Sequence, residues 1–435
     1  MEDKINRLET YMDSLTANEF FNGAVLVGHK GEILLKKGYG YASFQYDIFN
    51  SSTTKFRVGS LTKAFTAIGI MLLHEKGKLD IDHQIDKILA DYPNGSVITI
   101  RHLLTNTSGI PNFTSSPEYW VKTMRLPSNL DAVIDSFKNL PLEFTPGTDM
   151  NYSNSGYLVL TKIIEKASGQ SYADFLQNEI FKKLGLKCTG IDDGRRIVKS
   201  MAEGYTVWGD IIHTEHIDMS FPLGAYGMYS TLEDLYIWCQ ALLKSTLVDQ
   251  SLQEQMFTNI NRYGYGFGWF IDEGEYKTCS HFGDVNGFVN HLVMYPNEDL
   301  VVIVLSNLNI TPVTQISSDL AKIIFGEEVN SVSLIVPLEG DSLPLGSFEG
   351  TYKSDKVEIT VRHDDNELFA VVPKMYGVPY KFRLQPIQVE AAKMICKSDF
   401  INDTYTFFLD NNRAPYRLEF TDCYGQVCLL ERQKL

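Results

Sequence analysis

The chain has 435 residues, of which 44% are hydrophobic and 12% aromatic, and its formal net charge is −15 at pH 7. This length exceeds one ordinary domain, so the composition predicts a large domain and a small one with ample buried core. The acidic balance, without a local cluster of lysine and arginine, argues against a general nucleic-acid or anionic-membrane partner and favours a small-molecule or peptide substrate.

The N-terminal section is expected to form a helix followed by a hairpin. Apolar residues recur at helical spacing from Lys4 to Leu15, and two strand-like runs follow at 24–28 and 32–39, joined at Lys30-Gly31. The first residues lack the apolar core of a secretory signal, and no apolar run reaches the roughly 18 residues of a membrane-spanning helix. The sequence therefore predicts a cytoplasmic protein without a membrane segment, unless a signal or anchor precedes it.

The middle section, from Thr62 to about Lys244, is mostly helical in pattern and is punctuated by turns. Strands return at 280–295 and 300–305, and a helix is expected near 313–324. The first section is thus helix then strand, and the last is strand then helix. We therefore expect an α+β domain in which both ends build one sheet, covered by helices, with an all-helical lobe beside it.

The C-terminal section changes in texture after a proline-bearing segment. Short alternating runs separated by turn clusters occur there, at 357–361, 368–372, 380–384, 405–409, 416–420 and 427–430. Six or more such strands in under about a hundred residues fit a closed or nearly closed barrel, which leaves no exposed edges. The predicted organisation is a large domain over 1–330, a linker over 331–344 and a small all-β domain over 345–435.

The first candidate site motif is Ser60-Leu61-Thr62-Lys63, which opens a run that is apolar around most of a helix circumference. Alone the motif is weak, because Ser52-Thr53-Thr54-Lys55 also matches and a serine at a helix start is commonly a cap. On the functional interpretation, Lys63 lies one turn beyond Ser60, so its amine can fold back beside the hydroxyl. An apolar setting lowers the pKa of Lys63, whereas a retained cation favours deprotonation of a neighbouring hydroxyl. Either state activates Ser60.

Two further motifs follow in chain order. Tyr152-Ser153-Asn154, if extended, places a phenol and a carboxamide on the same side of the chain. His281-Phe282-Gly283 lies in a predicted strand, where Gly283 lets a substrate backbone approach and the N–H of Asp284 can join that of Ser60 as an oxyanion hole. Each motif alone has an ordinary structural interpretation. Their order and context together favour a serine acyl-transfer site.

With these motifs the chain resembles the serine β-lactamase and penicillin-binding-protein superfamily, and most of all its class C and DD-peptidase branch. The resemblance covers about residues 1–330 and extends to the segments 99–109 and 226–231. It implies a β-lactamase/transpeptidase-like fold with the site between the sheet and the helical lobe. The C-terminal section is similar to the lipocalin-like barrel appended to some of these hydrolases.

The resemblance also implies a role for each matching side chain. Ser60 would be the nucleophile, Lys63 and Tyr152 would share general acid/base work, Asn154 would orient substrate and Lys63, and His281 would lie on the site-lining strand. No metal or organic cofactor is implied. The histidine variant of the third motif occurs in D-peptide hydrolases and esterases of this superfamily, whereas many β-lactamases have Lys-Thr-Gly there, so recognition of a free carboxylate is expected to be weak.

The function predicted from the sequence is a serine hydrolase that cleaves an amide or ester, of a D-amino-acid-type peptide or a small ester, through an acyl-enzyme on Ser60. The alternative is a penicillin-binding or sensor protein that is acylated without efficient turnover. An α/β-hydrolase is disfavoured because no G-x-S-x-G occurs. A metalloenzyme is disfavoured because the segment from His213 to His216 has no metalloprotease spacing. The oligomeric state and the physiological substrate stay open.

Overall fold

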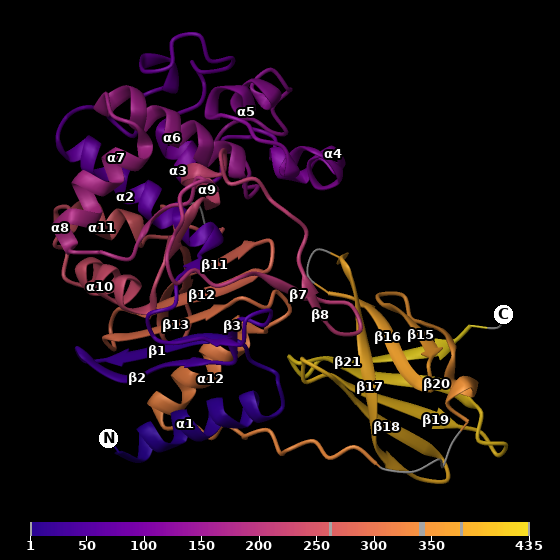
Figure 1. Ribbon diagram of the computed structural model, residues 1–435. Coiled ribbons are helices and arrows are strands. Elements are labelled where there is room, and N and C mark those ends of the chain that lie inside the picture. The colour runs from indigo at the N-terminus through magenta and orange to yellow at the C-terminus, as the bar shows by residue number, and fades with distance from the viewer. Residues whose placement is uncertain (1, 261–262, 339–343, 375–376, 434–435) are drawn as a thin grey trace.

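The structure is a computed structural model that describes residues 2–260, 263–338, 344–374 and 377–433 (Figure 1). Its centre is a six-stranded antiparallel sheet in the order β10-β11-β12-β13-β1-β2. The strands are β1 (Gly23–His29), β2 (Glu32–Tyr39), β10 (Phe270–Glu273), β11 (Lys277–Val285), β12 (Phe288–Tyr295) and β13 (Leu300–Ser306). Since β1 pairs with both β2 and β13, the two ends of the domain share this sheet, and that expectation is confirmed.

Helices cover both faces of the sheet. On one face, α1 (Glu2–Ala17) and α12 (Val313–Phe325) pack against alternate residues of the strands, as Leu8, Leu320 and Val302 show. On the other face, α2 (Thr62–Glu75) and α10 (Leu232–Leu243) pack against the intervening residues. Every residue of β13 is consequently buried, which explains its unbroken apolar sequence.

The helical lobe lies beyond α2 (Figure 1). Its longest helix is α6 (Asn154–Ser168), and the other helices of this part of the chain are α3 (Ile100–Leu104), α4 (Pro117–Val121), α5 (Leu130–Phe137), α7 (Tyr172–Leu176), α8 (Lys182–Leu184), α9 (Leu223–Tyr226) and α11 (Gln250–Met256). Single turns complete it at η2 (Ile85–Lys87), η3 (Phe113–Ser115), η4 (Thr123–Arg125) and η5 (Gln177–Phe181). None of the described helices is long and apolar enough to cross a membrane.

Short strands interrupt the section that the sequence predicts as mostly helical. They are β6 (Gly190–Ile191), β7 (Tyr205–Val207), β8 (Ile211–His213) and β9 (Met228–Ser230), while β3 (Tyr41–Ser43), β4 (Ile48–Phe49) and β5 (Phe56–Arg57) precede that section. Strand β9 pairs with both β5 and β6. This small sheet fixes the segment that leads from β5 into Ser60.

The C-terminal section forms a closed barrel of eight antiparallel strands after the turn η6 (Leu345–Phe348), so the predicted all-β barrel is confirmed. Its strands are β14 (Gly350–Lys353), β15 (Glu358–Asp364), β16 (Glu367–Pro373), β17 (Pro379–Val389), β18 (Lys393–Ser398), β19 (Thr404–Leu409), β20 (Pro415–Thr421) and β21 (Val427–Arg432). The exact division at 331–344 stays a proposal, because residues 339–343 of that predicted linker lie outside the described residues.

The hairpin of β7 and β8 attaches the barrel to the large domain (Figure 1). The Gly209 N–H donates to the Lys381 carbonyl oxygen at 2.6 Å, beside a bridge between Trp208 and Lys381. Tyr205 and Val207 of the hairpin share one buried apolar cluster with barrel residues. A backbone bond and a common core therefore hold the start of β17 next to the large domain.

Candidate active site

Ser60 lies in a 3₁₀ turn, η1 (Gly59–Leu61), immediately before α2. Gly59 has φ of +55°, and the Thr62 hydroxyl donates to the Gly59 carbonyl oxygen at 2.6 Å, which fixes the turn. Neither η1 nor α2 has a side-chain cap, so the Ser60 hydroxyl is not used to cap a helix. Ser60 is half-buried, and this leaves its hydroxyl within reach of a substrate.

Lys63 is fully buried beside this hydroxyl, with 0% of its surface exposed. Its Nζ lies 3.1 Å from Ser60 Oγ, 2.6 Å from Asn154 Oδ1 and 2.8 Å from the Ala225 carbonyl oxygen. Burial, with no carboxylate to offset it, lowers the pKa of Lys63 well below its ordinary value. A neutral amine has two N–H donors, which the amide and backbone oxygens can accept. Its lone pair is then available to accept the proton of the Ser60 hydroxyl, 3.1 Å away.

Asn154 and Tyr152 complete the surroundings of the Lys63 amine. Asn154 is the first residue of α6, whose start is capped by the Ser153 side chain, and its Nδ2 donates to Thr114 Oγ1 at 2.9 Å. This second bond orients the carboxamide so that its oxygen points at Lys63. The Tyr152 ring lies 4.7 Å from Lys63 Nζ, measured to the ring centroid. The first two sequence motifs therefore meet at one amine.

His281 lies on β11, and both of its ring nitrogens have partners within the protein. Nδ1 lies 2.7 Å from the Phe282 carbonyl oxygen and Nε2 lies 3.1 Å from the Tyr265 hydroxyl. Because a carbonyl only accepts, Nδ1 carries the proton and Nε2 accepts from Tyr265. Burial lowers the pKa of His281 to about 3, so the ring is neutral. Its centroid lies 6.1 Å from that of Tyr152, so the third motif also reaches the site.

The backbone of β11 passes directly against η1. A Cβ atom added to Gly283 would lie 2.1 Å from the Val58 carbonyl oxygen, and one added to Gly59 would lie 2.6 Å from the Asp284 nitrogen. Glycine is therefore required at both positions for this close approach. The contact brings the backbone N–H groups of Ser60 and Asp284 into neighbouring segments, as an oxyanion hole needs.

Several groups around the site have no counterpart in the sequence motifs. Tyr265, which is 1% exposed, bonds to His281, and Gly268 lies so close to α2 that an added Cβ would be 2.9 Å from the Lys63 carbonyl oxygen. Both belong to the run Tyr-Gly-Tyr-Gly-Phe-Gly at 263–268, whose alternation is the signal that could have identified them. The Ala225 carbonyl has no such signal, because any residue type supplies a backbone oxygen.

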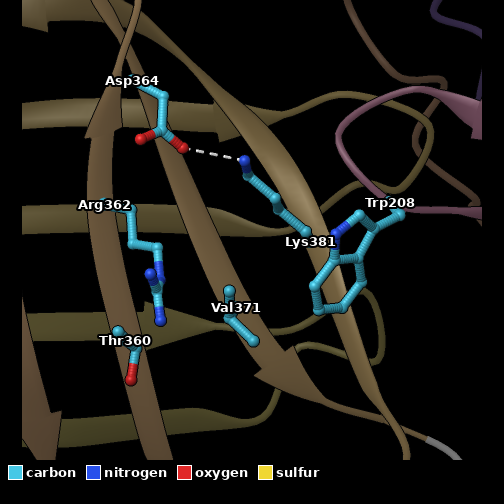
Figure 2. A pocket seen from close by; sticks show the side chains of 6 residues that line it. All are labelled: Trp208, Thr360, Arg362, Asp364, Val371 and Lys381. Atoms are coloured by element: carbon cyan, nitrogen blue, oxygen red, sulfur yellow. Dashed lines mark hydrogen bonds and ion pairs between the residues drawn. The ribbon is translucent and has the colours of Figure 1, made fainter.

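A separate cavity of about 310 Å³ lies on the outer face of the barrel. Figure 2 shows Trp208 of the β7–β8 hairpin beside Lys381, whose amine forms an ion pair with Asp364. None of the motif residues line it. In the part of the chain that the structure describes, no group of three or more histidine, cysteine, aspartate or glutamate side chains is placed to hold a metal ion.

Comparison with known proteins gives a consistent family. A family model described as Beta-lactamase matches residues 8–322. Penicillin-binding protein 4* of Bacillus subtilis (strain 168) is 31% identical over 328 residues, which cover 70% of this chain and 72% of that protein. A second protein of that strain, putative penicillin-binding protein PbpX, is 32% identical over 312 residues, covering 70% of this chain and 74% of PbpX.

Solved structures share the fold. The octameric penicillin-binding protein homologue from Pyrococcus abyssi aligns with a TM-score of 0.67 at 22% identity, over 98% of this chain and 100% of that one. The D-amino acid amidase from Ochrobactrum anthropi SV3 aligns with a TM-score of 0.67 at 23% identity, over 74% of this chain and 99% of that one. The first alignment includes the barrel as well as the large domain.

Proposed function

This chain belongs to the β-lactamase family of serine hydrolases, and on that premise we propose that it hydrolyses amides or esters through an acyl-enzyme on Ser60. The observation that carries the proposal is the contact of 3.1 Å between Ser60 Oγ and the buried amine of Lys63. A neutral amine at that distance can take the hydroxyl proton as Oγ attacks the carbonyl carbon.

The proposed reaction follows from the groups around Ser60. Attack by Oγ forms a carbon–oxygen bond, and the backbone N–H groups of Ser60 and Asp284 stabilise the resulting oxyanion. Lys63 and Tyr152 return the proton to the leaving nitrogen or oxygen as its bond to carbon breaks. Water then attacks the acyl carbon, Lys63 and Tyr152 accept its proton and return it to Ser60 Oγ, and the bond between Oγ and the acyl carbon breaks. Asn154 accepts a hydrogen bond from the Lys63 amine and so orients it, and the His281 ring packs beside the Tyr152 ring.

The proposed substrates are D-amino-acid-type peptides or amides and small esters. Similarity to the D-amino acid amidase and to a D-stereospecific amidohydrolase from Streptomyces sp. supports this class. A neutral His281 supplies no positive charge for a substrate carboxylate, and Phe282 packs against the apolar cluster under the sheet. Weak hydrolysis of β-lactam antibiotics, whose carboxylate would lack a cationic partner, is therefore part of the proposal.

The test is turnover together with intact mass on p-nitrophenyl esters, D-aminoacyl p-nitroanilides and a chromogenic cephalosporin. Wild type is expected to hydrolyse at least one ester or anilide, and Ser60→Ala is expected to lose both turnover and covalent labelling. Ser52→Ala is the matched control, because it removes the serine of the other Ser-x-x-Lys sequence, whose Lys55 amine instead donates to the Lys199 carbonyl oxygen. Labelling of Ser60 without turnover would contradict the hydrolase proposal and support the alternative, a penicillin-binding or sensor protein.

A further inference from the structure

The turn after α3 contains a buried asparagine that the proposed chemistry does not use. Asn106 belongs to the segment 99–109, and only 2% of its surface is exposed. It lies two residues beyond the end of α3 with a left-handed φ of +56°, a conformation that asparagine tolerates better than most residues. The end of a helix explains this backbone conformation. It does not explain why the carboxamide is buried.

Two oxygens of Asn106 hold the segment that contains Tyr152. The backbone carbonyl oxygen of Asn106 accepts from the Asn151 N–H at 3.0 Å. The side-chain Oδ1 accepts from the Ser153 N–H at 3.1 Å, in a bond that is buried. One asparagine therefore binds the backbone on both sides of Tyr152.

These two bonds restrict how the Tyr152 side chain can turn. The two bound nitrogens are two residues apart, which is roughly 6–7 Å in an extended chain. Rotation of the segment about its long axis would break both bonds and leave the buried Ser153 N–H without an acceptor. Asn154 is held separately, because its N–H donates to Asn112 Oδ1 at 3.1 Å. The carboxamide of Asn106 thus acts mainly on the position of Tyr152.

The nitrogen of the same carboxamide lies near Tyr265. A backbone N–H only donates, so the amide atom that faces Ser153 is the oxygen and Nδ2 points elsewhere. Nδ2 is buried and makes no hydrogen bond of ordinary geometry among the described residues. Burial raises the pKa of Tyr265 well above its ordinary value, and the neighbouring Asn106 amide opposes this rise. Since the Tyr265 and Tyr152 rings are 6.3 Å apart, the carboxamide adjoins both.

A glycine at this position would separate the two roles that Asn106 can have. Glycine adopts a φ of +56° without strain and keeps the backbone carbonyl that binds Asn151. It would therefore be sufficient if the residue only ended α3. Only a side-chain oxygen can bind the Ser153 N–H from this turn.

We propose that Asn106 is a positioning residue for the proposed hydrolysis, whose carboxamide holds the Tyr152 phenol where it can exchange a proton with Lys63 and Ser60. Asn106 itself does not touch the substrate. The inference rests on the proposed function, in which Tyr152 moves protons, and it adds a residue that acts only through Tyr152. Its removal should therefore slow the chemical step and leave substrate binding nearly unchanged.

The first experiment compares steady-state kinetics of three single variants on the best ester. Asn106→Gly is expected to lower kcat by about tenfold or more with KM within about twofold of wild type, because a misplaced proton-transfer group slows the reaction. Asn106→Asp keeps an oxygen that can accept from the Ser153 N–H and should recover most of the rate. Asn94→Gly is the matched control: it makes the same substitution at the same φ of +56°, at an exposed turn, and should keep wild-type values.

The second experiment repeats Asn106→Gly in a Tyr152→Phe background. A residue that acts through the phenol has little effect once the phenol is gone, so the two losses should not multiply. Intact mass is used to follow the residual acylation of Ser60. Asn106→Gly should lower that rate by less than about threefold in Tyr152→Phe. The same fold loss in both backgrounds would overturn the positioning role.

A further variant keeps the test decisive if Asn106→Gly lowers the stability of the protein. Asn106→Ser removes the carboxamide and leaves a hydroxyl too short to replace Oδ1. Serine occurs in this chain at similar φ values, +61° at Ser200 and +50° at Ser245. Asn106→Ser should therefore fold, and the same loss of kcat is expected from it.

The outcomes separate this inference from the proposed function. A wild-type kcat in Asn106→Gly and Asn106→Ser, or a loss that appears in KM alone, would overturn the positioning role and leave the hydrolase standing. Full activity of Tyr152→Phe would remove the group through which Asn106 acts and would overturn the inference as well. Turnover that does not depend on Ser60 would overturn the proposed function, and the positioning role with it.

Discussion

Lys374 in the barrel and Lys63 in the large domain are held by different kinds of partner. In the barrel, the Lys374 amine pairs with the Asp403 carboxylate, whose side chain is 0% exposed, so the buried negative charge has a cationic partner. In the large domain, Lys63 is as deeply buried but meets only neutral oxygens, and Asp284 meets no partner among the described residues. The paired Asp403 supports the fold although burial still raises its pKa, whereas the lowered pKa of Lys63, which has no carboxylate partner, leaves an amine that chemistry can use. Variants that replace these side chains test this difference between the two domains.

Replacing Lys63 has the largest expected effect on activity. Lys63→Met keeps an apolar stem of similar length but removes the amine that faces Ser60, so kcat should fall by roughly 10²- to 10⁴-fold, the scale of lost acid/base help. Lys374→Met removes the amine that pairs with Asp403 in the barrel and should keep a kcat near that of wild type once folded protein is counted. Steady-state kinetics on the best ester measures both. A near-normal rate in Lys63→Met would remove Lys63 from the mechanism.

Replacing Lys374 has the largest expected effect on stability. Lys374→Met leaves the Asp403 carboxylate buried and unpaired, so the free energy of unfolding should fall by about 3–5 kcal/mol. Replacing both partners, as Lys374→Met with Asp403→Leu, should recover much of that loss, because no charge stays buried. Urea unfolding followed by circular dichroism measures these changes. A loss below about 1 kcal/mol in the single variant would mean that the pair is not compensating a buried charge.

A smaller effect concerns how stability depends on pH. The folded pKa of Asp284 is about 7, above its ordinary 3.8, so between these values the folded chain holds a proton that the unfolded chain has released. The contribution of this group to the free energy of unfolding is therefore complete below pH 4 and is lost as pH rises to about 7. Asp284→Asn should flatten this part of the profile relative to wild type. Parallel profiles for the two proteins would contradict the raised pKa.

The sequence predicted the architecture well where periodicity was strong. The expected helix at 4–15 and the runs at 24–28 and 32–39 correspond to α1, β1 and β2. The barrel followed from alternation, but β14 and β18 were missed. In β18 the inward residues are Met394, Cys396 and Ser398. The outward residues are Ile395 and two lysines, so apolar and polar residues do not alternate clearly in this strand. Short strands such as β9 were missed because only tertiary pairing makes them strands.

The candidate site, too, could be predicted from the sequence only in part. Motif residues could be found because the proposed chemistry requires particular side chains at Ser60, Lys63 and Asn154. The lowered pKa of Lys63 and the raised pKa of Asp284 both depend on burial by segments that are far apart in the chain. Long-range packing fixes these features, and a local pattern does not record them.

The central claim is that Lys63 is neutral and takes the proton of Ser60, and the pH dependence of Ser60 acylation tests it most directly. The measurement is quenched-flow intact mass with a p-nitrophenyl ester, in wild type and in Asp284→Asn, which removes the titration of the Asp284 carboxyl group. The account predicts that the acylation rate rises with pH to a plateau reached well below the ordinary lysine pKa, and that this rise disappears in Lys63→Met. An acylation rate that keeps rising into the ordinary lysine range, or the same profile without Lys63, would contradict it.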